Sequence, residues 1–556
     1  MARFTCQRVL ITEAPFGELD AGRGWIEQGI WPAFWITHPS APAAPCRMEY
    51  RLNVSVAGSG ATTMRLHTAG DEHYEFRVDG ALAGWGSERG TVAHWYFDTY
   101  DLTLEPGDHC LTAKVTAAGK CALRSQMSVV PAFLLAAETA GFSTGEAAWE
   151  VRHLEGLDFE KPFDHDFFSV GWNSIHDAAR RVAAGEGWQP ARALHPGSTA
   201  GRRNRHADIH LLAPAVLPVS GRAAFIGGVV RHVSPITTGL VRDTNHRPDE
   251  AGSWAAWWDD DEPLILPPGQ QRRVLFDLQD YVCAWPQLEV SGGCGARVRI
   301  FWAESLSEAE GSAHKGNRAA LEGKTFSGLG DTFLPDGSSA HTFDGPFIRA
   351  GRYVEMIVTA GEEPLVLNAI RLLRAEYPLE ISARFATKLA CVEPLLERCR
   401  RTVRASCHDS LIDGPYYEQM GWIGDTAQVS LTLYSMSADT RLVRKALDVF
   451  DRSRLPCGMI RARWPARDSL VLPPYAMCWI NVLHDFSWWR NEPGFVQDRL
   501  PGMRAILDGL LGRVDETDGL LRIPSGWNFT DWVHGWDGGI PPRDPDGAGA
   551  VLQWQL

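Results

Sequence analysis

The hydrophobic period of the chain changes once, and this change limits its fold more than any other feature. Up to about residue 378, short runs such as 47–56 alternate apolar and polar residues and end at Gly, Pro or Asp. Alternation with period two, interrupted by turns roughly every 8–12 residues, is typical of β-sandwiches. Apolar residues then recur with the spacing of an amphipathic helix at Leu389, Val392, Leu396 and Val403. The sequence therefore predicts a β-rich N-terminal part followed by an all-α part.

Three carboxylates lie within thirteen residues ahead of another predicted helix. Asp413, Glu418 and Asp425 occur in the segment 411–428, LIDGPYYEQMGWIGDTAQ, among glycines, a proline and aromatic residues. Hydrolysis of a sugar bond needs one carboxyl that holds a proton for the leaving oxygen, and others that bind ring hydroxyls. Aromatic side chains offer flat apolar faces to a sugar ring and exclude water around an acid. The segment therefore predicts the active-site loop of a glycosidase.

Each of these carboxylates also has an interpretation without catalysis. Glu418 can be a surface glutamate or the partner in an ion pair. Asp413 can close an Asx turn ahead of Gly414, and Asp425 can be the N-cap of the helix that follows it. A capping aspartate keeps a second oxygen for a sugar hydroxyl, so a cap and a substrate contact are compatible.

The same segment resembles a known signature. Asp-x-Pro-x-x-Glu followed by Gly-Trp-x-Gly-Asp is similar to the active-site motif of bacterial α-L-rhamnosidases, glycoside hydrolase family 78. The resemblance implies that Glu418 is the general acid, that Asp413 and Asp425 bind rhamnose, and that Trp422 contacts the substrate. An enzyme of this family inverts the anomeric carbon and needs no cofactor, so none is expected here, and no metal site is predicted.

A second segment extends the resemblance. Residues 525–539, SGWNFTDWVHGWDGG, are similar to the Trp-x-Phe-x-Asp-Trp segment that lines the rhamnose subsite in that family. This implies Trp527, Asp531 and Trp532 as further substrate contacts. Thr530 stands where an apolar residue is common, which is a mild departure from the pattern.

The resemblance also implies a domain organisation. We expect an N-terminal jelly-roll-like β-sandwich over 1–139, a connector with β structure over 140–263, and a second β-sandwich over 264–384. Residues 385–556 are expected to form about half of an (α/α)6-toroid catalytic domain. No segment matches the region of the family's general base, and VLQWQL at the end reads as the start of a helix. We therefore expect a C-terminally incomplete enzyme that is inactive by itself.

The connector gives weaker signals. SIHDAARRVAAG at 174–185 predicts a short helix, and WAAWWDDDEP at 254–263 predicts a loop or domain edge. A basic cluster has no standard spacing of metal or phosphate ligands and is interpreted as a solvated connector. Its members are Arg202, Arg203, Arg205, His206 and His210.

Composition narrows the partners and the compartment. A net charge of −14 and a pI near 5.7 argue against nucleic acid and anionic membranes as partners. The N-terminal sequence has no apolar stretch of signal-peptide length, and the eleven cysteines are odd in number and scattered. A cytoplasmic protein with reduced thiols is predicted, with a carbohydrate as its partner, and the sequence predicts no oligomeric state.

Other functions remain open at this point. One is an exo-glycosidase of another sugar specificity on the same scaffold, altered through Gly414, Trp422 and the 525–539 loop. A second is a truncated, non-catalytic carbohydrate-binding protein, and a third is a degenerate gene product without a folded catalytic part.

Overall fold

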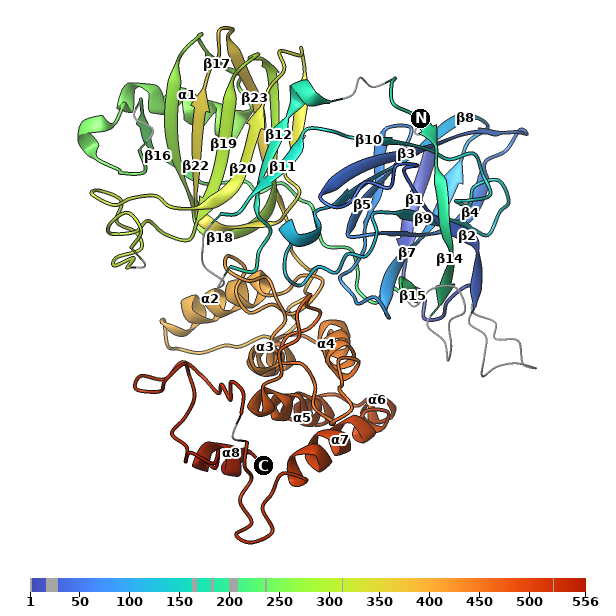
Figure 1. Ribbon diagram of the computed structural model, residues 1–556. Coiled ribbons are helices and arrows are strands. Elements are labelled where there is room, and N and C mark those ends of the chain that lie inside the picture. Colours follow the sequence, from blue (N-terminus) through green and yellow to red (C-terminus); the bar gives the residue numbers. More distant parts are fainter. Residues whose placement is uncertain are drawn as a thin grey trace. The chain divides into compact units, whose positions relative to one another are not determined.

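The computed structural model describes residues 3–16, 29–162, 168–181, 185–199, 209–235, 238–312, 314–523 and 525–556. The chain divides into two compact units. The β unit comprises Met1–Leu123, Met127–Glu376 and Pro415–Tyr417, and the helical unit comprises Arg124–Gln126, Tyr377–Gly414 and Glu418–Leu556. Strands fill the blue-to-yellow part of the chain and helices the orange-to-red part (Figure 1). The predicted order of a β-rich part before a helical part is confirmed.

The first sandwich of the β unit packs two sheets against one core. One sheet contains, in order, β1 (Phe4–Val9), β7 (Trp95–Leu104), β15 (Leu211–Pro214), β14 (Arg192–Thr199), β2 (Ile30–Thr37), β9 (Phe133–Ala137) and β4 (Thr62–Gly70). The other contains β13 (Gln189–Pro190), β10 (Glu150–His153), β3 (Cys46–Val56), β8 (Gly107–Ala117), β5 (His73–Val78) and β6 (Ala81–Gly86). Alternate residues of both sheets, such as Tyr50, Phe76 and Leu135, are fully buried between them. Apolar residues with period two therefore build this core as predicted.

The second sandwich is built around one very long strand. Its sheet contains, in order, β11 (Leu157–Glu160), β12 (Asn173–Asp177), β20 (Leu329–Leu334), β19 (Arg297–Ala303), β22 (Arg349–Thr359), β18 (Gln271–Gly292), β23 (Leu365–Arg374) and β17 (Leu264–Leu266). Two further strands, β16 (Val229–Ser234) and β21 (His341–Asp344), also pair with β18. The β18 register shifts between Asp277 and Val282, where Gln279 has a φ of 58°. Before this irregularity β18 also pairs with β16, and after it with β23 and β21, while β22 pairs with β18 on both sides.

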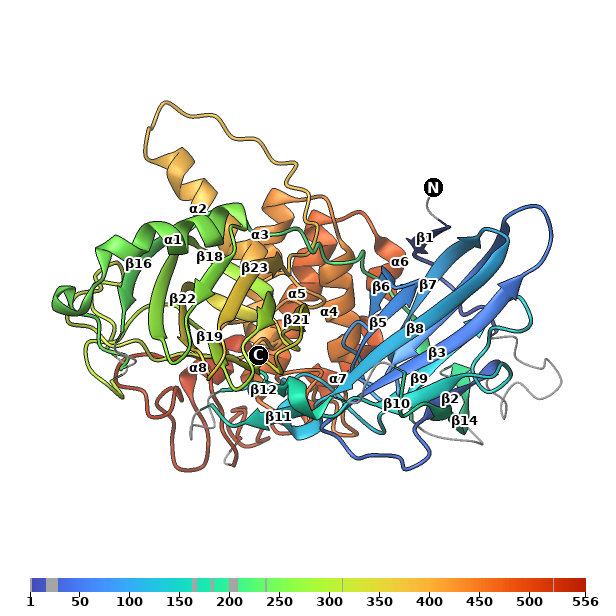
Figure 2. The same cartoon turned by 90° about the horizontal axis from the view of Figure 1, so that it is seen from above.

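Two predictions for the connector are wrong. Residues 254–263 were expected to form a loop, but α1 spans Pro248–Asp260 and lies along the second sandwich (Figure 2). Proline at its start and acidic residues in its first turn favour a helix, and Trp254 and Trp257, three residues apart, bury their rings in the sheet's core. The expected helix at 174–185 is instead β12 followed by a 3-10 turn at Ala178–Arg180. Parallel pairing of β12 with β20 outweighs its local helical pattern.

The basic cluster of the connector is only partly visible. Arg202, Arg203, Arg205 and His206 lie outside the described residues. His210 is fully buried and hydrogen-bonds to Asp71 through Nε2 at 2.8 Å, with its ring stacked on Trp35. His210 is therefore a structural core histidine, and its assignment to a solvated connector was wrong.

The helical unit contains the predicted amphipathic helices. They are α2 (Val392–Ala405), α3 (Ile423–Met436), α4 (Arg441–Asp451), α5 (Pro473–Trp489), α6 (Pro493–Gln497), α7 (Leu500–Leu511) and α8 (Ala550–Gln555). Helix α5 is the central one, and Trp479, Val482 and Phe486 on it are completely buried. Helices α6 and α7 are separate, because Pro501 lacks the N–H that a continuous helix requires.

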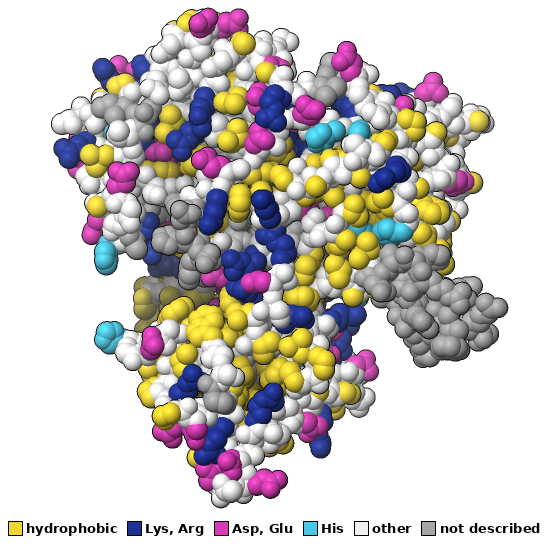
Figure 3. Space-filling model, in the orientation of Figure 1, with side chains coloured by type: hydrophobic (Ala, Val, Ile, Leu, Met, Phe, Trp, Pro, Cys, Tyr) yellow, Lys and Arg dark blue, Asp and Glu magenta, His cyan; other side chains and the backbone are white. Residues whose placement is uncertain are grey.

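The surface of the helical unit carries exposed aromatic side chains. Trp488, Trp532 and Trp554 are among its large exposed apolar residues. On the face shown in Figure 3, apolar side chains gather over this unit. No helix in the described ranges is long and apolar enough to cross a membrane.

Candidate active site

The loop that carries Asp413 and Glu418 is shaped by its own backbone. The N–H of Asp413 donates to the Met420 carbonyl at 3.0 Å, and the N–H groups of Glu418 and Gln419 donate to the Gly414 carbonyl at 3.2 and 2.9 Å. Gln419 has a φ of 51°, which reverses the chain there. The Asp413 carboxylate accepts from the Met420 N–H at 3.4 Å, across the loop. The loop thus returns Glu418 toward Asp413.

The loop then enters α3 along a neighbouring segment. Trp422 pairs with Arg463 as an antiparallel bridge, and the Ile423 N–H donates to the Ala462 carbonyl at 2.9 Å. Trp422 is the N-cap of α3, and Asp425 is the third residue inside the helix. The expectation of an Asp425 cap was therefore wrong. The position still suits a carboxylate, because the N-terminal turn of a helix favours negative charge.

Glu418 is held by an indole. The Nε1–H of Trp422 donates to Oε2 of Glu418 at 2.7 Å. The Arg463 guanidinium lies over the Trp422 ring, 5.1 Å from its centroid, and the charge of Glu418 acts on this arginine. One carboxylate oxygen of Glu418 is thus fixed by a neutral donor beside a positive charge.

Asp413 and Glu418 form a coupled pair of carboxyl groups. Burial, the negative charge of Glu418 and a hydrogen bond between the two side chains together raise the pKa of Asp413 to about 9. Two carboxyls in contact do not both ionise readily, so the pair retains one proton near neutral pH. One carboxyl group of the loop therefore stays protonated near neutral pH.

Asp425 lies near the pair and near a fourth carboxylate. Burial raises the pKa of Asp425 to about 6, and the charges of Glu418 and Asp531 act in the same direction. Asp531 itself is exposed, and its Oδ1 accepts the N–H of Trp532 at 2.7 Å. The acid loop and the 525–539 loop are therefore close enough to interact electrostatically.

A row of aromatic rings joins the same two loops. The ring of Tyr475 meets Trp422 edge-on with centroids 6.1 Å apart, and lies 5.7 Å from Phe529. Phe529 in turn lies 5.0 Å from Trp527 and 5.1 Å from Trp532. These contacts place all seven sequence-predicted site residues in one region of the helical unit.

The second glycine of the Gly-Trp-x-Gly-Asp motif, Gly424, is required for a steric reason. A Cβ on Gly424 would lie 2.6 Å from ring atoms of Tyr475, which packs directly on this residue. Trp527 is fixed by a hydrogen bond from Nε1 to the Gly538 carbonyl at 2.7 Å, while Trp532 is 66% exposed. An exposed, anchored indole pair is suited to stacking on a sugar ring.

Three residues of this region were not singled out from the sequence. Tyr475 follows two prolines at the start of α5, Phe529 is the Phe of the Trp-x-Phe-x-Asp-Trp segment, and Arg463 lies in a loop. Only the motif position of Phe529 signalled a role. Over the described part of the chain, no group of three or more His, Cys, Asp or Glu side chains is arranged to hold a metal ion.

Comparison with known proteins finds a protein-family match that includes this region. Residues 381–546 match the bacterial alpha-L-rhamnosidase six-hairpin glycosidase domain. No curated protein sequence matches the chain.

Solved structures resemble the fold over most of the chain. A family 78 rhamnosidase of Bacillus sp. GL1 superposes with a TM-score of 0.73 at 16% identity, over 90% of this chain and 71% of that one. The α-L-rhamnosidase of Aspergillus terreus gives 0.64 at 15% identity, over 94% and 58%. The Streptomyces avermitilis α-L-rhamnosidase, solved with L-rhamnose, gives 0.56 at 19% identity, over 88% and 44%. The chain thus spans about half the length of the last two proteins, and at these identities the likeness concerns the fold.

Proposed function

We propose that this chain is a family 78 α-L-rhamnosidase and removes terminal α-L-rhamnose from glycosides or polysaccharides, because residues 381–546 match the six-hairpin glycosidase domain of bacterial α-L-rhamnosidases and a solved family 78 rhamnosidase has a similar fold. The feature that carries this proposal is the loop that returns Glu418 toward Asp413, where burial and the charge of Glu418 raise the pKa of Asp413 to about 9. A hydrolase of this kind must deliver a proton to the leaving oxygen, and few side chains hold one at that pH.

In the proposed mechanism Glu418 is the general acid. The proton of the Asp413–Glu418 pair passes through Glu418 to the glycosidic oxygen as the bond to the anomeric carbon breaks. The pair then carries two negative charges, which is unfavourable in the free site. An oxocarbenium-like sugar places positive charge beside them at that moment, so the carboxylates stabilise the transition state more than the substrate. Asp413 thus tunes the acid as well as binding the sugar.

The remaining residues bind the rhamnose ring in this proposal. Asp425, with its pKa near 6, is mostly ionised at neutral pH and accepts hydrogen bonds from ring hydroxyls. Asp531 does the same from the 525–539 loop. Trp527 and Trp532 present their faces to the apolar side of the sugar, and Trp422 holds Glu418 in place.

We further propose that α2–α8 are part of a six-hairpin (α/α)6 toroid and that the reaction inverts the anomeric carbon. Inversion requires a second carboxylate roughly 6.5–9.5 Å from the acid, with room for a water molecule between them. The configuration of the first-formed rhamnose tests this step. Nuclear magnetic resonance should show β-L-rhamnose before mutarotation, whereas α-L-rhamnose would mean retention.

A panel of p-nitrophenyl glycosides that includes the α-L-rhamnoside tests the proposed function. Preferential hydrolysis of the rhamnoside by the chain, slowed in Glu418→Gln, would support the proposed function and would mean that a general base lies among its residues, against the expected inactivity of the chain by itself. Glu397→Gln is the matched control, because Glu397 is exposed on α2 and pairs only weakly with Arg400 at 3.5 Å. Preference for another sugar would favour an exo-glycosidase of different specificity. Rhamnose binding without turnover of any glycoside would instead favour a non-catalytic carbohydrate-binding protein.

A further inference from the structure

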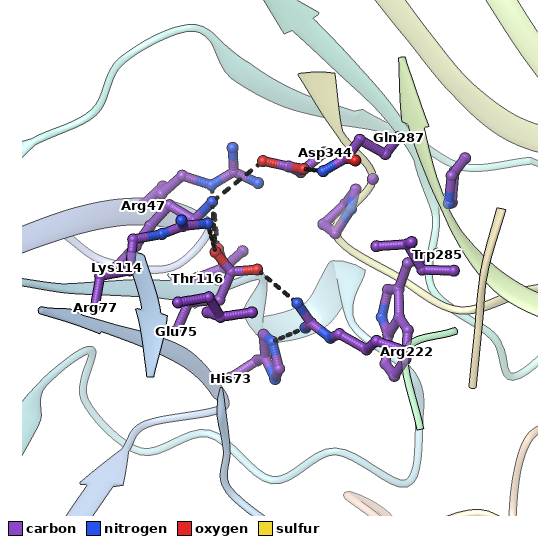
Figure 4. Close-up of a pocket in the computed structure, with 15 residues that line it drawn as sticks. Arg47, His73, Glu75, Arg77, Lys114, Thr116, Arg222, Trp285, Gln287 and Asp344 are labelled. Atoms are coloured by element: carbon purple, nitrogen blue, oxygen red, sulfur yellow. Dashed lines mark hydrogen bonds and ion pairs between the residues drawn. The ribbon is translucent and has the colours of Figure 1, made fainter. Parts of the chain in front are cut away.

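A cavity inside the β unit is unusually rich in cationic side chains. It has a volume of about 210 Å³ and is lined from β3, β5 and β8 of the first sandwich and from β18 and β21 of the second (Figure 4). Its polar lining consists of Arg47, His73, Glu75, Arg77, Lys114, Thr116, Arg222, Gln287 and Asp344. None of these residues belongs to the helical unit or to the candidate active site.

The charges around the cavity do not balance. Four of the lining side chains are cationic, and two, Glu75 and Asp344, are carboxylates. Glu75 is surrounded by Lys114 at 3.0 Å, Arg222 at 3.2 Å and Arg77 at 3.4 Å. This leaves an excess of two positive charges.

The other groups of the lining do not offset this excess. Asp344 lies 3.6 Å from Lys114 and accepts a hydrogen bond from the Gln287 amide at 2.8 Å. His73 adds no charge, because burial and the nearby Arg222 lower its pKa to about 4. The carboxylates of the lining are thus already engaged.

Arg47 is the cation with the least compensation. Its side chain is buried and donates from Nε to Thr116 at 3.1 Å. In the described parts of the chain no carboxylate lies within ion-pair distance of its guanidinium, and burial lowers its pKa to about 10. The Nε of Arg222 is also buried without a hydrogen-bond partner. A buried guanidinium normally has an anionic partner, because removing its charge from water is costly.

We propose that this cavity binds a compact oxyanion, either the carboxylate of an acidic sugar or a phosphate group. The planar guanidinium of Arg47 and the ammonium of Lys114 are the donors that such groups prefer. The volume is below the range of about 300–1,000 Å³ typical of drug-sized ligands, which limits the occupant to one small anionic group or one sugar acid. The amide of Gln287 and the ring of Trp285 supply the polar and apolar contacts of a sugar ring. This inference does not depend on the proposed rhamnosidase activity.

Isothermal titration calorimetry on the full chain tests the proposal with D-glucuronate, inorganic phosphate and neutral D-glucose as probes. Glucuronate or phosphate should bind with an affinity that falls with added salt, and glucose should not bind. Binding of glucuronate alone would identify an acidic-sugar site, and binding of phosphate alone a phosphate site. Absence of binding by both anions would overturn the proposal.

Variants locate the binding and remain informative if one of them fails to fold. Arg47→Gln and Lys114→Gln should each weaken binding about tenfold or more, since each removes a charge-assisted hydrogen bond. Asp344→Asn should tighten binding several-fold, because it removes a competing negative charge without changing shape. The control is Arg51→Gln, on the same strand as Arg47, where Arg51 pairs with Glu150 outside the cavity. An affinity unchanged in both Lys114→Gln and Asp344→Asn would refute the assignment.

Discussion

Asp425→Asn should make the protein more stable at neutral pH while impairing its function. The folded protein holds the Asp425 pKa near 6, about two units above the ordinary value of 3.8. Since the folded state keeps this proton to higher pH than the unfolded state, the carboxyl stabilises the fold fully below about pH 4 and loses that contribution as the pH rises through 6. Two pKa units correspond to about 3 kcal/mol of unfolding free energy. Asparagine does not ionise, so the variant does not lose this unfolding free energy as the pH rises.

The magnitude is reduced by one opposing effect. Asp425 is in the first turn of α3, where a negative charge is favoured by roughly 0.3–1 kcal/mol. The net expectation is a gain of about 2 kcal/mol for Asp425→Asn near pH 8 relative to its effect near pH 4. The pH dependence of the difference is the informative quantity, because packing changes caused by the amide are the same at both pH values.

Urea denaturation followed by far-ultraviolet circular dichroism measures this difference, since the helical signal reports mainly on the unit that contains α3. The wild-type chain and the variant are compared near pH 4, 6 and 8, at a fixed ionic strength. A free-energy difference between them that is constant with pH would refute the reasoning. So would a variant that loses stability relative to wild type as the pH rises.

Two other substitutions test separate parts of the structure. Trp422→Phe removes the donor to Glu418, a hydrogen bond to a charged group worth about 1.5–3 kcal/mol. The kcat/KM for the rhamnoside should therefore fall by about 10–100-fold, and an unchanged kcat/KM would contradict the assigned role of this contact. Arg349→Met breaks a completely buried ion pair with Asp331 in the second sandwich and should destabilise the β unit by about 3–5 kcal/mol. Thermal unfolding measures the loss, and a variant within about 1 kcal/mol of wild type would mean that the pair is not needed.

The hydrophobic periodicity of the sequence predicted secondary structure correctly where one face of a strand or helix is buried. The strand at 46–56 lies where alternation predicted it, and α2, which buries Val403, lies where helical spacing predicted it. The pattern failed at α1, where two buried tryptophans were interpreted as a domain edge, and at β12, where pairing with a distant strand decides the structure. Neither long-range pairing nor the face on which a tryptophan packs is encoded in local spacing.

The candidate site shows the same division. The spacing and the motif in the sequence predicted that Asp413, Glu418 and Asp425 lie near one another, because the three residues occupy one loop and the helix that follows it. Tyr475 and Arg463 were not found, since they approach Trp422 only through the packing of other segments. The interaction between the Asp413 and Glu418 side chains was not predicted either, because it depends on a loop that returns through Gln419.

The central claim, that the carboxyl pair supplies a proton through Glu418, is tested most directly by leaving-group dependence. Methyl α-L-rhamnoside needs protonation of its leaving oxygen, and p-nitrophenyl α-L-rhamnoside leaves as a stable anion. Glu418→Gln should slow hydrolysis of the methyl rhamnoside by about 10²–10⁴-fold and that of the p-nitrophenyl rhamnoside far less. Equal losses on both substrates, or no loss on the methyl rhamnoside, would contradict the account.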